Sequence, residues 1–266
     1  MSLHSRLHLP REHGAWAMFY VPFALGVTVA GRINFAVMLL LVATTALFIS
    51  RESLLVWWRA RNRGRRNERA GRLLIIYFAI AAVAGGPLLL VDRLGRLPAL
   101  AIAGAALLAI NGKQATELED RTALGEVMAI VGLAMAAPAA HYVASGQWTL
   151  AALWLWALSA AYFSSSVFYI KLRVTGLHAK NQQDKERARR QCIGYHSLLV
   201  ASLLALAVAR SLPPLALIAF APVLARALWG LLKPARRLNL KRIGIAEVVY
   251  ALFFLFVITL TFRSAV

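Results

Sequence analysis

The sequence is short of acidic residues and almost free of cysteine. Only 11 of its 266 residues are Asp or Glu, against 30 Lys or Arg, so the formal net charge is +19. Charged residues of both signs make up 15% of the chain, whereas soluble domains have roughly 25%. The single Cys192 cannot form an intrachain disulfide. These shortages exclude an ordinary soluble protein and a disulfide-stabilised scaffold.

Motifs for nucleotide and metal chemistry are also missing. The chain has no Gly-rich P-loop, no dinucleotide-binding glycine pattern and no His-Glu-x-x-His zinc pattern. Its three aspartates, Asp92, Asp120 and Asp184, lie in separate loops, and Glu117 and Glu119 beside Asp120 complete the one acidic cluster. Magnesium sites for phosphates usually need carboxylates. The cofactor is therefore left open, with Mg²⁺ unsupported by any Asp-rich motif.

Long apolar runs take up most of the chain. Hydrophobic residues make up 60% of it, above the roughly 45–50% of soluble domains. A membrane-spanning helix needs about 20 mostly apolar residues. This length predicts nine spans, at about residues 14–30, 34–50, 73–91, 97–112, 125–143, 148–170, 192–210, 212–232 and 243–262. We therefore expect an all-α, polytopic membrane protein in which residues 1–266 form a single integral membrane domain.

The basic residues indicate an orientation. One set of alternate loops has only Arg32, Arg93, Arg96 and Arg210, with Arg263 in the C-terminal tail, whereas most of the 30 basic residues lie in the opposite set. Positive residues accumulate on the cytoplasmic side of a membrane. We therefore expect a bacterial inner-membrane protein with a cytoplasmic N-terminus and an external C-terminus. Because the charge lies between apolar runs, no nucleic-acid partner is expected.

The loop lengths suggest a repeat. The two longest loops, at about 51–72 and 171–191, lie four helices apart and on the same face. Two four-helix halves in the same orientation, followed by one terminal helix, would produce this spacing. The loop lengths alone carry this 4+4+1 prediction, because no repeated sequence is visible.

Polar residues within the spans gather at the ends that we expect to face the cytoplasm. Tyr162, Ser166, Tyr169 and Arg173 share one face of a helix by their spacing. Charges inside spans usually face a cavity or a partner, so we predict a polar cavity open to the cytoplasm. Its candidate ligand-binding residues are His13, Arg51, Asn111, Lys113, Tyr169 and Arg173, and its candidate catalytic residues are Glu52 and Glu247.

In this cavity Arg51 and Arg173 would hold an anionic headgroup, because a guanidinium offers several directed donors. Lys113 would add a charge, Tyr169 and Asn111 would supply neutral hydrogen bonds, and Glu52 or Glu247 would act as a base or orient an arginine. A plainer interpretation stays open for each residue. Arg51, Arg173 and Arg226 can extend from span ends to lipid headgroups, and His13 can be a core histidine.

The segment Leu9-Pro10-Arg11-Glu12-His13-Gly14-Ala15-Trp16-Ala17-Met18 resembles the N-terminal signature of YwiC-like membrane proteins. Weaker similarities are Ser50-Arg51-Glu52-Ser53-Leu54-Leu55, Ala136-Ala137-Pro138-Ala139-Ala140 and Ser165-Ser166-Val167-Phe168-Tyr169-Ile170-Lys171-Leu172-Arg173. The resemblance implies a bacterial multi-pass membrane protein.

The nine-helix plan is also similar to that of UbiA-type intramembrane prenyltransferases. Those enzymes transfer isoprenoid chains and bind Mg²⁺ on two Asp-rich motifs around the second and sixth loops. Here Arg51-Glu52 stands at the first position, and the sixth loop has Asp184 alone. The resemblance therefore implies a UbiA-like scaffold, but no catalytic residue of that family has a counterpart here.

Together these features predict a membrane protein that binds membrane lipids and an anionic amphipathic ligand, either a lipid or an isoprenoid. A UbiA-like transferase without the Asp-rich motifs is the enzyme that the scaffold suggests. A transporter or flippase, and a non-catalytic accessory membrane protein, stay open as alternatives. The sequence leaves protein partners unknown.

The orientation predicts where reporters become active. A periplasm-active reporter fused after Val266 should be active, whereas reporters inserted near Arg65 or Lys185 should behave as cytoplasmic, because the basic loops stay inside. Activity assays of these fusions in bacterial cells make the comparison. A cytoplasmic reporter signal at Val266 would contradict the nine-span topology.

Overall fold

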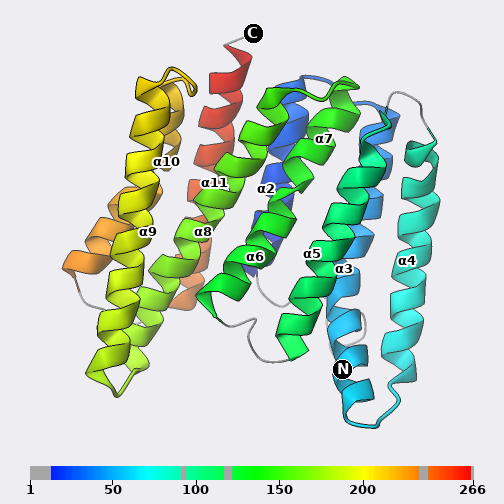
Figure 1. Cartoon of the computed structure of the whole chain (residues 1–266), viewed down its shortest axis with the longest axis horizontal. Coiled ribbons are helices and arrows are strands. Elements are labelled where there is room, and N and C mark those ends of the chain that lie inside the picture. The colour runs from blue at the N-terminus through cyan, green and yellow to red at the C-terminus, as the bar shows by residue number, and fades with distance from the viewer. Residues whose placement is uncertain (1–12, 91–93, 117–121, 234–238, 265–266) are drawn as a thin grey trace. The chain divides into compact units, whose positions relative to one another are not determined.

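The computed structural model describes residues 13–90, 94–116, 122–233 and 239–264, and within these ranges the chain is helical, without strands. This confirms the predicted all-α class. The helices are α2 (His13–Ala30), α3 (Phe35–Asn62), α4 (Glu68–Leu89), α5 (Leu97–Thr116), α6 (Ala123–Ala134), α7 (Ala136–Ser145), α8 (Leu150–His178), α9 (Gln182–Val208), α10 (Leu215–Leu232) and α11 (Leu240–Arg263) (Figure 1).

Most of these helices have the length and hydropathy of membrane spans. Seven segments of the described chain qualify, with α6 and α7 counted together as Ala123–Ser145, and the apolar parts of α2 and α5 are shorter. Large apolar side chains such as Val83, Leu198 and Phe256 are more than half exposed. Apolar side chains facing outward are what a surrounding lipid phase stabilises. The chain is a multi-pass membrane protein.

The chain divides into two compact units, residues 1–156 and 157–266, and α8 begins in the first and continues into the second. Within the first unit, α3 packs along α4, and α2 packs along α7. Within the second, α10 packs against α9 and α11. Each unit is described by itself. The single membrane domain and the 4+4+1 arrangement therefore stay predictions.

Several helices extend beyond the apolar runs that predicted them. The segments expected to be long loops, 51–72 and 171–191, are mostly helical, because α3 continues to Asn62, α8 continues to His178 and α9 already begins at Gln182. Hydropathy marks only the part of a helix that matches the hydrocarbon layer. Arg, Lys, Gln and Glu are good helix formers, so the helix continues through the basic sequence outside that layer.

The span predicted at 125–143 is interrupted. α6 ends at Ala134, and α7 begins at Ala136, with the Met135 N–H bonded to the Gly132 and Leu133 carbonyls. Pro138 has no N–H to donate to the carbonyl of Ala134, which favours a break here. α2 approaches this segment so closely that a Cβ on Gly26 would collide with the Ala137 backbone. The small residues of 136–140 therefore permit close helix contact.

Candidate functional site

The polar face of α8 is the centre of the second unit. Tyr162, Ser166, Tyr169 and Arg173, which the sequence places on one helical face, all contact α10, α11 or the residue that follows α10. Because the four residues are three or four positions apart, they form successive layers along the helix axis. The prediction that they share a face is confirmed.

A buried ion pair lies in the middle of these layers. Arg226 of α10 pairs with Glu247 of α11, and their side chains are 7% and 16% exposed. The Ser166 hydroxyl of α8 donates a hydrogen bond of 2.7 Å to the other carboxylate oxygen, Oε2. Glu247 is therefore held from two directions, and three helices meet at its carboxylate.

The guanidinium of Arg226 also lies against aromatic rings. Its Cζ is 4.4 Å from the ring centre of Tyr169 and 6.0 Å from that of Tyr250. Cation–π contacts of this kind stabilise a desolvated cation. The Nε and Nη2 atoms of Arg226 are buried, and neither has a hydrogen-bond partner among the described residues. The ion pair thus leaves two donors of a buried cation unused.

Tyr169 separates this ion pair from the next layer. The Tyr169 side chain fits against Gly230 of α10, where a Cβ would lie 2.9 Å from Cε2 of the ring and 3.6 Å from Cδ of Arg173. Only a residue without a side chain leaves room for this ring. Gly230 and Arg226 are one helical turn apart, so Tyr169 lies between the Arg226 layer and the Arg173 layer.

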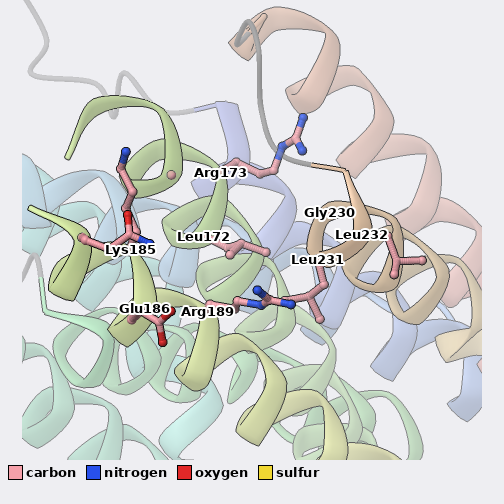
Figure 2. Close-up of a pocket in the computed structure, with 10 residues that line it drawn as sticks. Leu172, Arg173, Lys185, Glu186, Arg189, Gly230, Leu231 and Leu232 are labelled. Carbon is pink, nitrogen blue, oxygen red and sulfur yellow. The ribbon is translucent and has the colours of Figure 1, made fainter. Parts of the chain in front are cut away.

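A pocket of about 370 Å³ opens in the Arg173 layer (Figure 2). The end of α8, the start of α9 and the end of α10 form its walls. Its lining residues are Leu172, Arg173, Gly176, Gln182, Lys185, Glu186, Arg189, Gly230, Leu231 and Leu232. Three of them are cationic and one is acidic, and Figure 2 shows Arg189 reaching from α9 towards Leu231 of α10.

The helix extensions build this pocket. α8 and α9 continue past the apolar runs, and residues 179–181 connect them. The side chain of Asn181 begins α9 by accepting a hydrogen bond of 2.9 Å from the Gln183 N–H, as N-cap residues do. Arg173 Nη1 donates to the Lys233 carbonyl just after α10, at 2.7 Å. The basic side chains therefore stand on rigid helices and not on a loop.

Aromatic rings close the other end of the polar face. Tyr162 stacks on Phe254 with ring centres 4.2 Å apart, and Phe220 packs edge-on against both rings. All three side chains are almost fully buried. The polar layers that contain Arg173, Tyr169 and Ser166 therefore end on an aromatic layer, one turn further along α8.

Hydrogen bonds join α8 to α9 beside the ion pair. His196 Nδ1 lies 2.7 Å from the Cys192 carbonyl oxygen, and its Nε2 lies 2.9 Å from Ser165 Oγ. The carbonyl can only accept, so Nδ1 carries a proton, and in the neutral imidazole Ser165 therefore donates to Nε2. Tyr195 donates to the Ala161 carbonyl at 2.6 Å. These bonds fix the spacing of the two helices that form the pocket.

The candidate residues from the sequence fall into three groups. Tyr169, Arg173 and Glu247 lie in the second unit, in the layers just described. Arg51 and Glu52 lie in the first unit and form an ion pair of 3.0 Å, with side chains 29% and 33% exposed. The side chains of His13, Asn111 and Lys113 lie outside what the structure describes. A single pocket containing all eight residues stays a prediction.

Arg226 was not among the predicted site residues, and extension to lipid headgroups was one interpretation open for it. Its side chain instead points inward to Glu247. The available signal was one Arg in the apolar run 212–232 and one Glu in the apolar run 243–262, since buried charges are usually paired. Lys185, Arg189 and Gly230 were also missed, because they lie in segments expected to be loop or plain span.

Metal binding has little support in the described part of the chain. No group of three or more His, Cys, Asp or Glu side chains is close enough there to hold an ion. The acidic cluster of Glu117, Glu119 and Asp120 lies outside the described residues. The chemistry that the site offers is therefore that of directed cations, one paired carboxylate and hydroxyl groups.

Comparison with known proteins gives one match. A family model described as YwiC-like protein matches residues 9–141, half of the chain. No curated protein matches the sequence, and neither does any solved structure. The matched segment contains Arg51 and Glu52, whereas the ion pair and the pocket lie beyond its end.

The ion pair predicts a specific stability pattern. Glu247→Gln should destabilise the protein by about 3–5 kcal/mol, because it leaves Arg226 buried and unpaired. The double variant Arg226→Gln/Glu247→Gln should recover much of that loss. The exposed Arg72–Glu68 pair is the matched control, and Glu68→Gln should change stability by less than about 1 kcal/mol. Thermal unfolding in detergent gives these values, and an equal effect of Glu247→Gln and Glu68→Gln would contradict the account.

Proposed function

The chain belongs to the YwiC-like protein family, and on this premise we propose that it binds the anionic headgroup of an amphipathic molecule, a lipid or an isoprenoid phosphate. The observation that carries the proposal is the basic pocket between α8, α9 and α10. Arg173, Lys185 and Arg189 line it, and Glu186 is the one acidic residue there. Glu186 also lies 3.6 Å from Arg190, so its charge is shared with a cation outside the pocket.

The size of the pocket supports a headgroup as the ligand. Its volume of about 370 Å³ lies at the small end of the range for ligand sites, roughly 300–1,000 Å³. A phosphate with its attached polar group fits, whereas long acyl or prenyl chains do not. Next to the pocket, Leu228, Trp229 and Leu232 are all more than half exposed. The chains of the ligand would therefore lie along this apolar surface of α10.

The expected orientation agrees with this function. The pocket lies in the segments 171–191 and 230–232, which the distribution of basic residues assigns to the cytoplasmic face. Anionic lipids attract basic residues near that surface by about 1 kcal/mol for each Lys or Arg. We therefore propose that the protein takes its ligand from the cytoplasmic leaflet of a bacterial inner membrane.

Binding or modification of the headgroup is favoured over transport. In the second unit the polar layers end at the rings of Tyr162, Phe220 and Phe254, which favours a site that opens at one end. Glu247 pairs with Arg226 and accepts a hydrogen bond from Ser166, so of the two roles expected for it we propose that it orients the arginine. A UbiA-like transferase that works without Asp-rich motifs is the enzyme we propose for this arrangement.

The pocket predicts which basic residues hold the headgroup. Lys185→Ala/Arg189→Ala should weaken binding of phosphatidic acid at least tenfold, because two pocket cations are lost. Lys180→Ala/Arg187→Ala is the matched control, since it removes two exposed charges that do not line the pocket. Native mass spectrometry of delipidated protein, with phosphatidylcholine as the zwitterionic reference, measures the affinities. Equal losses in both double variants would show unspecific attraction and reject the pocket.

A further inference from the structure

Two nitrogen atoms of the buried Arg226 guanidinium have no hydrogen-bond partner among the described residues. The Arg226 side chain is only 7% exposed, and the two atoms are Nε and Nη2. A buried donor that lacks an acceptor carries most of its desolvation cost, and more so when it is charged. Buried polar groups in proteins are nearly always satisfied. An acceptor oxygen from a ligand would satisfy these donors.

The charges of the Arg226–Glu247 ion pair determine whether a ligand oxygen bound to Arg226 can be anionic or must be neutral. Glu247 already neutralises Arg226, and Ser166 already uses its proton on Glu247. A second anion at Nε and Nη2 would lie close to the Glu247 carboxylate and be repelled where screening is weak. A neutral acceptor such as a carbonyl oxygen has no such cost. The Arg226 layer thus fits a carbonyl group.

The distance from the pocket restricts the ligand further. Gly230 lines the pocket and lies four residues after Arg226 on α10, and Arg173 lies four residues after Tyr169 on α8. Four residues of helix span about 6 Å. A ligand whose phosphate lies beside Arg173 would therefore reach Arg226 with a group only a few bonds away. In an ester-linked glycerophospholipid, the ester carbonyls occupy that position, whereas an isoprenoid phosphate has only hydrocarbon there.

We propose that Arg226 forms an inner subsite for an ester carbonyl, and that the ligand of the pocket is a diacyl glycerolipid with an anionic phosphate. The inference rests on the proposed headgroup function and names its ligand class; it sets aside an isoprenoid ligand, so the UbiA-like transferase is not part of it. Tyr169 is the side chain between the two layers, and it contacts Gly230 on one side and Arg226 on the other.

Two lipids that differ only at the carbonyls test the subsite. Diacyl phosphatidic acid and its dialkyl ether analogue share the same headgroup, and farnesyl phosphate has neither a carboxylic ester nor glycerol. Native mass spectrometry of the full, delipidated chain should give at least tenfold tighter binding of the diacyl form. A hydrogen bond to a charged donor is worth at least the roughly 1.4 kcal/mol of a tenfold change. In Arg226→Met/Glu247→Met the two forms should bind equally, because methionine has no N–H to donate to the carbonyl. Glu68→Gln/Arg72→Gln should keep the preference.

A second measurement needs no variant. Infrared spectra of bound diacyl phosphatidic acid with isotope-labelled ester carbonyls should show the stretch at lower wavenumber than in protein-free micelles, as a hydrogen-bonded carbonyl does. Equal binding of diacyl and dialkyl lipid, an unshifted stretch, or equal binding of farnesyl phosphate would overturn the carbonyl subsite and leave the headgroup pocket standing. If no phosphate lipid binds better than phosphatidylcholine, the proposed function itself fails.

Discussion

A guanidinium and a carboxylate withdrawn from water inside a membrane protein are stable only when they meet, and Arg226 and Glu247 meet between α10 and α11. The ion pair also requires neighbouring side chains from α8 to lie at fixed positions. Ser166 must bring α8 close enough to donate to the carboxylate, and the Tyr169 ring must cover the guanidinium. Because an isolated buried charge is so costly, the register of these three helices follows from this one contact.

The pocket depends on that register. Once α8 and α10 are fixed at Ser166 and Arg226, their next turns place Arg173 and Gly230 side by side, and α9 completes the wall with Lys185 and Arg189. These turns lie where the apolar sequence gives way to basic sequence. The helices continue there because their basic residues are good helix formers. A basic pocket at the end of the apolar helix segments is the consequence.

The sequence was sufficient to predict the helical class, the approximate positions of the apolar helices and the common face of Tyr162, Ser166, Tyr169 and Arg173, because hydropathy and helical spacing are local properties. Of the nine predicted spans, seven have the length and hydropathy of a span in the described chain, and the apolar parts of α2 and α5 are shorter. It was not sufficient for features that depend on partners distant in sequence. From the sequence, Arg226 could be interpreted as a residue that extends to lipid headgroups. The structure instead pairs it with Glu247 on another helix. The helical extensions were missed because hydropathy does not distinguish a basic helix from a basic loop.

The central claim is that the second unit holds an anionic headgroup between α8, α9 and α10. The most direct measurement is photocrosslinking with phosphatidic acid whose reactive group is attached at the headgroup, followed by peptide mapping. The account predicts crosslinks within residues 172–176, 182–189 and 230–232, which line the pocket. Crosslinks spread along the exposed apolar helix faces, or confined to the basic segment that follows Arg51 in the first unit, would contradict it.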